Sequence, residues 1–209
     1  MTERVVDFWF EFGSHYSYLS VMRIGVVAAA HGVRVRWRPF LLGPIFRELG
    51  WATSPFVVQK EKGEYAWKDV ERQARKLALP FRRPSRFPRS AVLPARIALI
   101  GAGRPWGPAF VQETMRLNFV HDREMDLEEA MAQVLQELAL PAKAILAEAQ
   151  TEAGKQRLRA QTQEARALGI FGAPTFFAGG EMFWGNDRME DAFAACLRDD
   201  PVPRSALRV

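Results

Sequence analysis

Two serines, three positions apart, stand where an apolar segment ends and a helical pattern begins. Ser14 and Ser17 follow the segment VVDFWFEF and flank His15 and Tyr16. A hydroxyl in front of a helix can cap it by accepting a backbone N–H. It can also donate a hydrogen bond to an anion, and a helix N-terminus favours negative charge by about 0.3–1 kcal/mol in surface settings. The spacing therefore indicates either a helix cap at Ser14 or a site that holds an anion such as a thiolate.

A second polar pair, Asn186 and Asp187, precedes a helical pattern near the C-terminal end of the sequence. Either residue can cap that helix, and Asp187 with Glu190 has the spacing of a capping box. The open N–H groups of a helix start also suit a carboxylate, and Asp187 suits an ammonium group. The two roles are compatible, and the sequence leaves both open.

The elements that must position these residues lie at the two ends of the chain. Apolar and β-branched residues predict a strand over 5–12, a helix over 16–30 and a half-exposed strand over 33–38, which together form a β-α-β unit. Near the other end, two short strands over 175–178 and 182–184 are separated by two glycines that favour a tight turn. A helix follows them, so the ends read β-α-β and β-β-α.

The middle of the chain has helical patterns instead. One helix is expected over 126–140, with Asp126 as its N-cap. The fold class is therefore α/β, a thioredoxin-like fold with a large all-helical insertion. We expect the thioredoxin-like domain to be formed by 1–43 and 169–209, and the helical insertion domain by 44–168.

Composition narrows the classes of function. Hydrophobic residues make up 48% of the 209 residues and charged residues 25%, which is typical of a globular protein. Cys196 is the only cysteine, so no intrachain disulfide is possible, and a reducing, cytoplasmic location is expected. No apolar run is long enough to span a membrane. The net charge is +5, but the arginine cluster at 82–89 is short and broken by prolines, so nucleic acid is not expected as a partner. No group of His, Cys and carboxylate residues has metal-ligand spacing, so no metal is expected.

In redox proteins with a thioredoxin-like fold, the first strand-to-helix junction carries Cys-x-x-Cys, and here the same positions are serines. No internal redox couple is possible, so the sulfur of a thiol site would have to come from a ligand. A hydrolase triad at Ser14 is not supported, because the Gly-x-Ser-x-Gly pattern is absent.

Six blocks spread through the chain carry a resemblance to a known family: VDFWFEFGSHYSYL, LGPIFRELG, KGEYAWKDVERQARKLALPF, SRFPRSAVLPAR, GIFGAPTFF and FWGNDRM. In this order they resemble the 2-hydroxychromene-2-carboxylate isomerases, bacterial relatives of the kappa-class glutathione transferases within the DsbA-like group. The resemblance covers nearly all of the chain. It implies a DsbA/kappa glutathione transferase-like fold, glutathione as cofactor and a homodimer.

The resemblance also implies roles for individual residues. Ser14 is implied as the catalytic residue, its hydroxyl donating to the glutathione sulfur. The implied cofactor-binding residues are Ser14, Thr53, Lys62, Ala173, Pro174, Asn186 and Asp187. The bond between Ala173 and Pro174 is expected to be cis, although an ordinary strand-initiating proline is the alternative. Two departures from the family stand out: His15 replaces a common proline, as a proton shuttle or a tolerated substitution, and Thr53 replaces a frequent asparagine.

The substrate implied by the resemblance is a small aromatic carboxylate. Phe12, Tyr16, Phe87 and Trp184 are candidates for an apolar substrate pocket. On charge alone, an arginine of the 82–89 cluster, such as Arg83, is a candidate for binding the substrate carboxylate. The implied reaction interconverts 2-hydroxychromene-2-carboxylate and trans-o-hydroxybenzylidenepyruvate. A kappa-type transferase or peroxidase, and a glutathione-binding protein without turnover, remain as alternatives.

Overall fold

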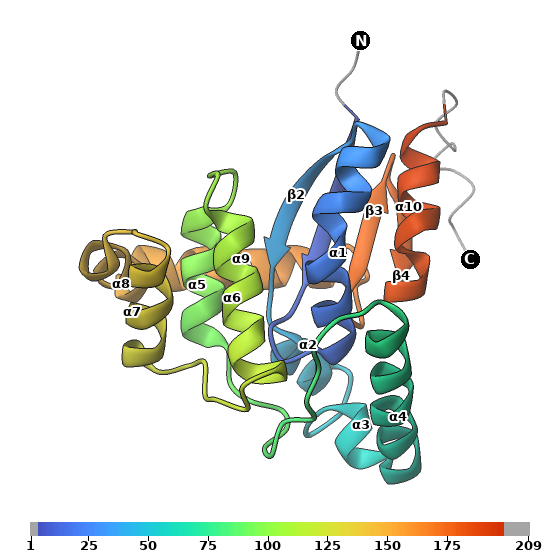
Figure 1. Cartoon of the computed structure of the whole chain (residues 1–209), viewed down its shortest axis with the longest axis horizontal. Coiled ribbons are helices and arrows are strands. Elements are labelled where there is room, and N and C mark those ends of the chain that lie inside the picture. The colour runs from blue at the N-terminus through green and yellow to red at the C-terminus, as the bar shows by residue number, and fades with distance from the viewer. Residues whose placement is uncertain (1–3, 199–209) are drawn as a thin grey trace.

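A mixed four-stranded sheet forms the centre of the molecule in a computed structural model, which describes residues 4–198 (Figure 1). In spatial order its strands are β2 (Arg34–Pro39), β1 (Val5–Phe10), β3 (Thr175–Ala178) and β4 (Glu181–Trp184). β1 runs parallel to β2 and antiparallel to β3, and β3 is antiparallel to β4. Helix α1 (His15–His31) links the parallel pair, as such a pair requires. The predicted β-α-β and β-β-α order is confirmed.

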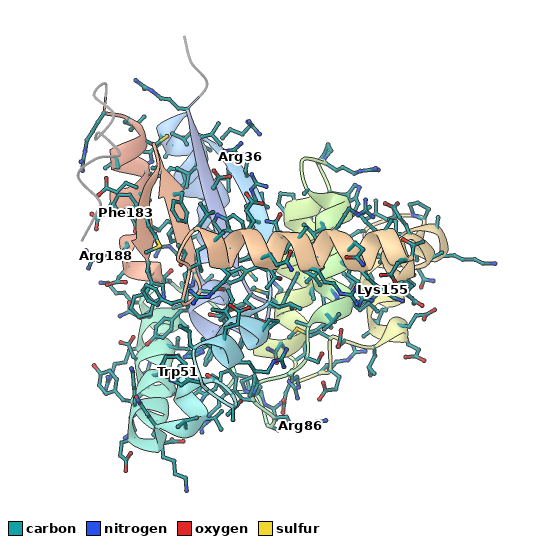
Figure 2. The ribbon with its side chains drawn as sticks, turned by 180° about the vertical axis from the view of Figure 1, so that it is seen from behind. Arg36, Trp51, Arg86, Lys155, Phe183 and Arg188 are labelled. Atoms are coloured by element: carbon teal, nitrogen blue, oxygen red, sulfur yellow. The ribbon has the colours of Figure 1, made fainter. Side chains whose placement is uncertain are left out.

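The side chains of β1 alternate between two hydrophobic cores, one on each face of the sheet. Val6, Phe8 and Phe10 belong to the larger core, to which α1 and α10 (Met189–Cys196) contribute. Trp9 belongs to a second core, formed with Phe40, Ile45, Ala165 and Ile170. Helix α9 (Glu152–Ala167) crosses this second face, as the rear view shows (Figure 2). The sheet is therefore packed on both faces, and α1 lies on the face of the larger core.

The middle of the chain is helical, as predicted. Its helices besides α9 are α2 (Leu42–Glu48), α3 (Pro55–Val58), α4 (Lys60–Lys76), α5 (Val92–Gly101), α6 (Gly107–Phe119), α7 (Glu128–Glu137) and α8 (Ala142–Gln150). Helices α3 and α4 lie together below the sheet in Figure 1, apart from α5–α8, which lie to the left of β2. In the part of the chain that the structure describes, no helix is both long and apolar enough to cross a membrane. The division at residues 43/44 and 168/169 stays a prediction.

The predicted start of the helix at Asp126 is wrong. Helix α7 begins at Glu128, and its N-cap, Leu127, makes no side-chain capping bond. The carboxylate of Asp126 instead accepts hydrogen bonds from the N–H of Leu93, at 2.6 Å, and from the hydroxyl of Ser90. A tertiary contact thus takes the side chain that the local pattern assigned to the helix.

The predicted capping by Asn186 or Asp187 is also wrong. Residues Asn186–Arg188 form a short 3-10 turn, η1, and α10 starts only at Met189 with no side-chain capping bond. The Asn186 oxygen accepts from the hydroxyl of Ser20, at 3.0 Å, and Asp187 pairs with Arg188, at 3.0 Å. Both polar side chains therefore have partners outside the backbone of α10.

Candidate functional site

Ser14 lies at the junction of β1 and α1 and is the N-cap of α1, as the sequence indicates. Its Oγ accepts a hydrogen bond from the N–H of Ser17, at 3.1 Å, and donates one to the carbonyl oxygen of Ala173, at 2.9 Å. The side chain is largely buried, with 9% exposed. Ser14 is therefore both a helix cap and a bridge to the loop before β3.

The loop before β3 contains the cis peptide bond between Ala173 and Pro174 that the sequence predicts. Among the described residues, no group accepts the N–H of Ala173, and its carbonyl oxygen accepts only from Ser14. The carbonyl of Pro174 accepts from the N–H of Gly185, at 2.9 Å, which closes the β3–β4 side of the loop. The backbone of Ala173 is thus available to pair in strand fashion with an extended peptide-like ligand.

Asn186 and Asp187 lie beside α1 but differ in exposure. Asn186 is 6% exposed and is held by the hydroxyl of Ser20, one turn along α1 from Tyr16. Asp187 is exposed, and its charge is among the causes that raise the pKa of Tyr16. The structure therefore brings Asp187 close to the end of α1 that carries Ser14, while Asn186 is bound one turn further along the helix.

Tyr16 connects α1 to α4. Its hydroxyl donates to the carboxylate of Asp69, at 2.9 Å. Burial is the largest cause that raises the pKa of Tyr16, followed by the hydrogen bond to Asp69 and its charge. The phenol therefore stays protonated and donates at physiological pH. The sequence did not single out Asp69, because only the tertiary fold brings it to the end of α1.

Glu11 is a second site residue that sequence reasoning missed. Its Oε2 accepts from the N–H of Gly13, at 2.9 Å, and a Cβ on Gly13 would lie only 3.1 Å from that oxygen. Burial raises the pKa of Glu11 to about 7, against the opposing effect of the Gly13 and Ser14 N–H groups. A carboxyl that titrates near neutrality thus lies beside the turn that carries Ser14. The feature of the sequence that could have identified Glu11 is an acidic residue at the end of an apolar strand.

His15 follows Ser14 and is 1% exposed. Its ring stacks on Trp67, with centroids 4.6 Å apart, and lies next to Tyr16, Phe56 and Phe87. Burial lowers the pKa of His15 to about 3, so the imidazole is neutral at physiological pH. Neither ring nitrogen has a hydrogen-bond partner in the described part of the chain. A proton shuttle that cycles near neutral pH does not fit this environment.

The three candidates from the helical middle are more exposed. Lys62 is exposed on α4, and Thr53 is half-buried in the segment between α2 and α3. Arg83 forms two hydrogen bonds with Glu64, at 2.9 and 2.6 Å, and its guanidinium lies 5.2 Å from the centre of the Trp67 ring. A substrate carboxylate at Arg83 would compete with Glu64.

The arginine cluster around Arg83 is paired with acidic side chains that the sequence alone did not associate with it. Arg89 is buried and bonds to Asp122, at 2.7 Å, and to Glu124, at 3.1 Å. Arg86 also pairs with Glu124, at 3.2 Å. These ion pairs therefore join the segment 82–89 to the loop after α6, and most of the cluster has a structural role.

The two remaining aromatic candidates lie in different environments. Phe12 is 1% exposed and packs edge-on against Phe10 in the larger core. Trp184, at the end of β4, is 52% exposed and packs against Phe171. A Cβ on Gly172 would lie 2.4 Å from the Trp184 indole nitrogen, so any other residue at 172 would displace this ring. Trp184 is open to a ligand, whereas Phe12 is a core residue as the fold stands.

Known proteins are similar to this chain along most of its length. The sequence model of the DSBA-like thioredoxin domain matches residues 5–195. A 2-hydroxychromene-2-carboxylate isomerase of Pseudomonas putida is 29% identical over 185 residues, covering 88% of this chain and 90% of that protein. An enzyme of the same name from Sphingobium xenophagum is 28% identical, covering 90% and 95%.

A solved structure of a 2-hydroxychromene-2-carboxylate isomerase superposes with a TM-score of 0.83 and 27% identity, covering 91% of this chain and 93% of that one. These similarities confirm the resemblance read from the six sequence blocks. They also confirm a thioredoxin-like fold with helices inserted into it.

Proposed function

This chain belongs to the DSBA-like thioredoxin domain family, and from that premise we propose that it is a glutathione-dependent isomerase. Its substrate is a 2-hydroxychromene-2-carboxylate-type compound, and its product is the ring-opened trans-o-hydroxybenzylidenepyruvate. Two curated relatives and one solved structure that carry the isomerase name, each with at least 88% of this chain matched, support the proposal. The site supports it through Ser14, a hydroxyl where the fold's redox members have a thiol.

The observation that carries the proposal is the hydrogen bond from Ser14 to Ala173, beside a cis-proline. It brings together a hydroxyl at a helix N-terminus and a backbone segment whose N–H has no partner among the described residues. An extended thiol peptide fits such a pair of features, because its backbone can pair with Ala173 while its sulfur reaches the helix start. The residues present therefore suit glutathione.

Glutathione, when bound, supplies a thiolate that adds reversibly to a conjugated carbon, so that a double bond can rotate and re-form. The role of Ser14 is to stabilise the negative charge on that sulfur by donating a hydrogen bond from its hydroxyl group. In the structure the Ser14 hydroxyl donates its hydrogen bond to the Ala173 carbonyl. A peptide N–H that takes over the Ala173 carbonyl releases the Ser14 proton for the sulfur. Binding of glutathione and stabilisation of its thiolate are thus coupled through the carbonyl oxygen of Ala173.

The ends of the cofactor fit the remaining polar residues. Asp187 suits the ammonium group of the γ-glutamyl end, and Asn186, together with the N–H groups of the turn η1, suits its carboxylate. Lys62 suits the glycyl carboxylate, and the Thr53 hydroxyl is a further hydrogen-bonding group for the cofactor. These assignments place opposite charges at the two ends and leave the sulfur at Ser14.

Most of the residues proposed to bind the substrate are aromatic. Tyr16 and Trp184 present partly exposed rings, Arg83 offers a guanidinium for the substrate carboxylate, and Phe12 supports Phe10 from within the core. Tyr16 donates from a phenol that remains protonated. A homodimer and a cytoplasmic location remain part of this proposal, on the strength of the resemblance.

The test is to mix the purified protein with 2-hydroxychromene-2-carboxylate and follow the absorbance of the ring-opened product, with and without reduced glutathione. We expect turnover only with glutathione, and an unchanged amount of free glutathione at the end. Steady loss of glutathione would indicate a kappa-type transferase or peroxidase instead. Binding of glutathione without turnover of any electrophile would indicate a binding protein.

A further inference from the structure

His15 has a buried imidazole with no hydrogen-bond partner. Both ring nitrogens lack one in the described part of the chain. Other buried atoms without partners occur there on Trp9, Arg96, Thr114 and Gln161, which are spread over β1, α5, α6 and α9. His15 differs from them because two of its atoms, not one, lack a partner and because it directly follows Ser14.

The surroundings of His15 explain why it has no partner. The ring is enclosed by Tyr16, Phe56, Trp67 and Phe87, with centroid distances from 4.6 to 5.7 Å. These neighbours come from α1, α3, α4 and the loop before α5, so the enclosure forms where the helical middle meets α1. The hydroxyl of Tyr16 is occupied by Asp69. The enclosure therefore offers the imidazole aromatic faces and edges instead of hydrogen-bonding groups.

An orphaned polar group inside a protein costs free energy, and native structures contain few of them. An apolar side chain would avoid that cost at His15. When such a cost persists beside a functional residue, a ligand that completes the hydrogen bond is a physical reason for it. The neutral imidazole carries one N–H donor and one lone pair, so it can accept a proton donor such as a hydroxyl.

We propose that His15 is a specificity-determining residue that accepts a hydrogen bond from the phenolic hydroxyl of an aromatic ligand. This inference rests on the proposed function, which supplies a ring-opened product with such a hydroxyl. The enclosure suits an aromatic ring, because aromatic rings pack face-to-edge or offset-stacked on one another. A free carboxylate is a poor occupant, because it would be desolvated there without a cation. Phe56 and Phe87 are both half-buried, so the enclosure is less deeply covered on their side than at His15 itself.

The experiment compares two ligands that differ only in the hydroxyl: trans-o-hydroxybenzylidenepyruvate and trans-benzylidenepyruvate. Binding is measured without glutathione, so that no turnover occurs, for the wild type, for His15→Phe and for His31→Phe. The His31 variant is a matched control, because His31 is exposed at the far end of α1. We expect the wild type and His31→Phe to bind the hydroxylated compound about three- to tenfold more tightly than its analogue. His15→Phe should lose that preference.

A second measurement does not depend on the variant folding. The chain has three histidines, so the ring nitrogens of His15 can be followed by nitrogen NMR in the wild-type protein. The signal of its unprotonated nitrogen should shift with the hydroxylated compound and stay unmoved with the analogue. A preference that survives in His15→Phe, an equal loss for both ligands, or an unmoved nitrogen signal would each overturn the inference. So would failure of the wild type to bind the hydroxylated compound.

The outcomes separate this inference from the proposed function. If the wild type turns over the chromene and His15 has no role in the preference for the hydroxyl, the inference about His15 is wrong and the proposed isomerase function stands. If binding depends on His15 but no turnover occurs with glutathione, the proposed isomerase function is wrong and the protein has a binding site for hydroxylated aromatic compounds.

Discussion

The Ser14 Oγ and the carbonyl oxygen of Ala173 lie 2.9 Å apart, although 159 positions separate the two residues in the sequence. This hydrogen bond joins the start of α1 to the loop before β3. It engages the only proton that the hydroxyl has, while one of its lone pairs accepts from Ser17. Any ligand that draws on the Ser14 proton must therefore first satisfy Ala173.

Replacing Ser14 by alanine tests its role in activating a thiol. If its hydroxyl stabilises a bound thiolate by about 1.5–3 kcal/mol, Ser14→Ala should raise the pKa of bound glutathione by about one to two units. Turnover should fall by about ten- to 150-fold. Loss of the N-cap should also cost about 1 kcal/mol of stability. The thiolate absorbance is titrated against pH in the wild type and the variant.

Ser17→Ala is the matched control, since it removes the second hydroxyl of the motif but keeps the N–H that Ser14 accepts. It should leave the pKa of the bound thiol close to that of the wild type. If Ser14→Ala lowers the melting temperature but leaves the pKa of the bound thiol unshifted, Ser14 acts only as a helix cap.

Reduced glutathione should stabilise the fold. At 100 times its dissociation constant, a ligand adds about 2.7 kcal/mol to the free energy of unfolding. Asp187→Asn and Lys62→Ala should each diminish the rise in melting temperature, because each removes a charge from one end of the proposed glutathione site. Asp191→Asn and Lys60→Ala are matched controls, since Asp191 shares Arg188 with Asp187 and Lys60 lies two positions from Lys62. No rise at millimolar glutathione would remove the cofactor from the proposal.

The ionisation of Glu11 should make the stability depend on pH. Burial raises its pKa from an ordinary 4.5 to about 7, so the folded state binds this proton more tightly than the unfolded state does. Its stabilising contribution is complete below about pH 4.5 and is lost as the pH rises through about 7. Glu11→Gln keeps an oxygen that can accept from Gly13 but cannot ionise. The variant should therefore gain stability relative to the wild type between pH 5 and 8.

Melting curves of the wild type and Glu11→Gln across that range measure the effect. Glu61→Gln, at an exposed carboxyl of α4, should show no such gain. If the difference between wild type and Glu11→Gln is the same at pH 5 and pH 8, Glu11 does not titrate in this range.

The protein alone should show no thiol–disulfide exchange. Ser14 and Ser17 occupy the dithiol positions, and the only cysteine, Cys196, lies on α10. Burial raises the pKa of the Cys196 thiol, and its Sγ donates to the carbonyl of Val5, at 3.6 Å, so little reactive thiolate is available. Insulin reduction without added glutathione is the assay. Activity clearly above a control without protein would contradict the prediction.

Local patterns predicted the elements that depend on neighbours in sequence. The strand over Val5–Phe10, the helix that starts after Ser14 and the tight turn at Gly179-Gly180 all follow from periodicity and turn chemistry. The strand ends two residues earlier than predicted, because the N–H of Ser14 bonds back to the carbonyl of Glu11 and forms a turn. The cis-proline was predicted from the likeness of the elements to a thioredoxin fold.

The amino-acid sequence by itself thus determined the elements, the helix cap at Ser14 and the family to which the residues point. Only the tertiary structure decided which partner each polar side chain has. Asp126 bonds to Leu93 instead of capping a helix, Asn186 bonds to Ser20, and Tyr16 bonds to Asp69. The physical reason is that periodicity encodes contacts within a few residues, whereas a side-chain hydrogen bond goes to whichever group packing brings within about 3 Å. The enclosure of His15 arises in the same way, from aromatic residues of four separate segments.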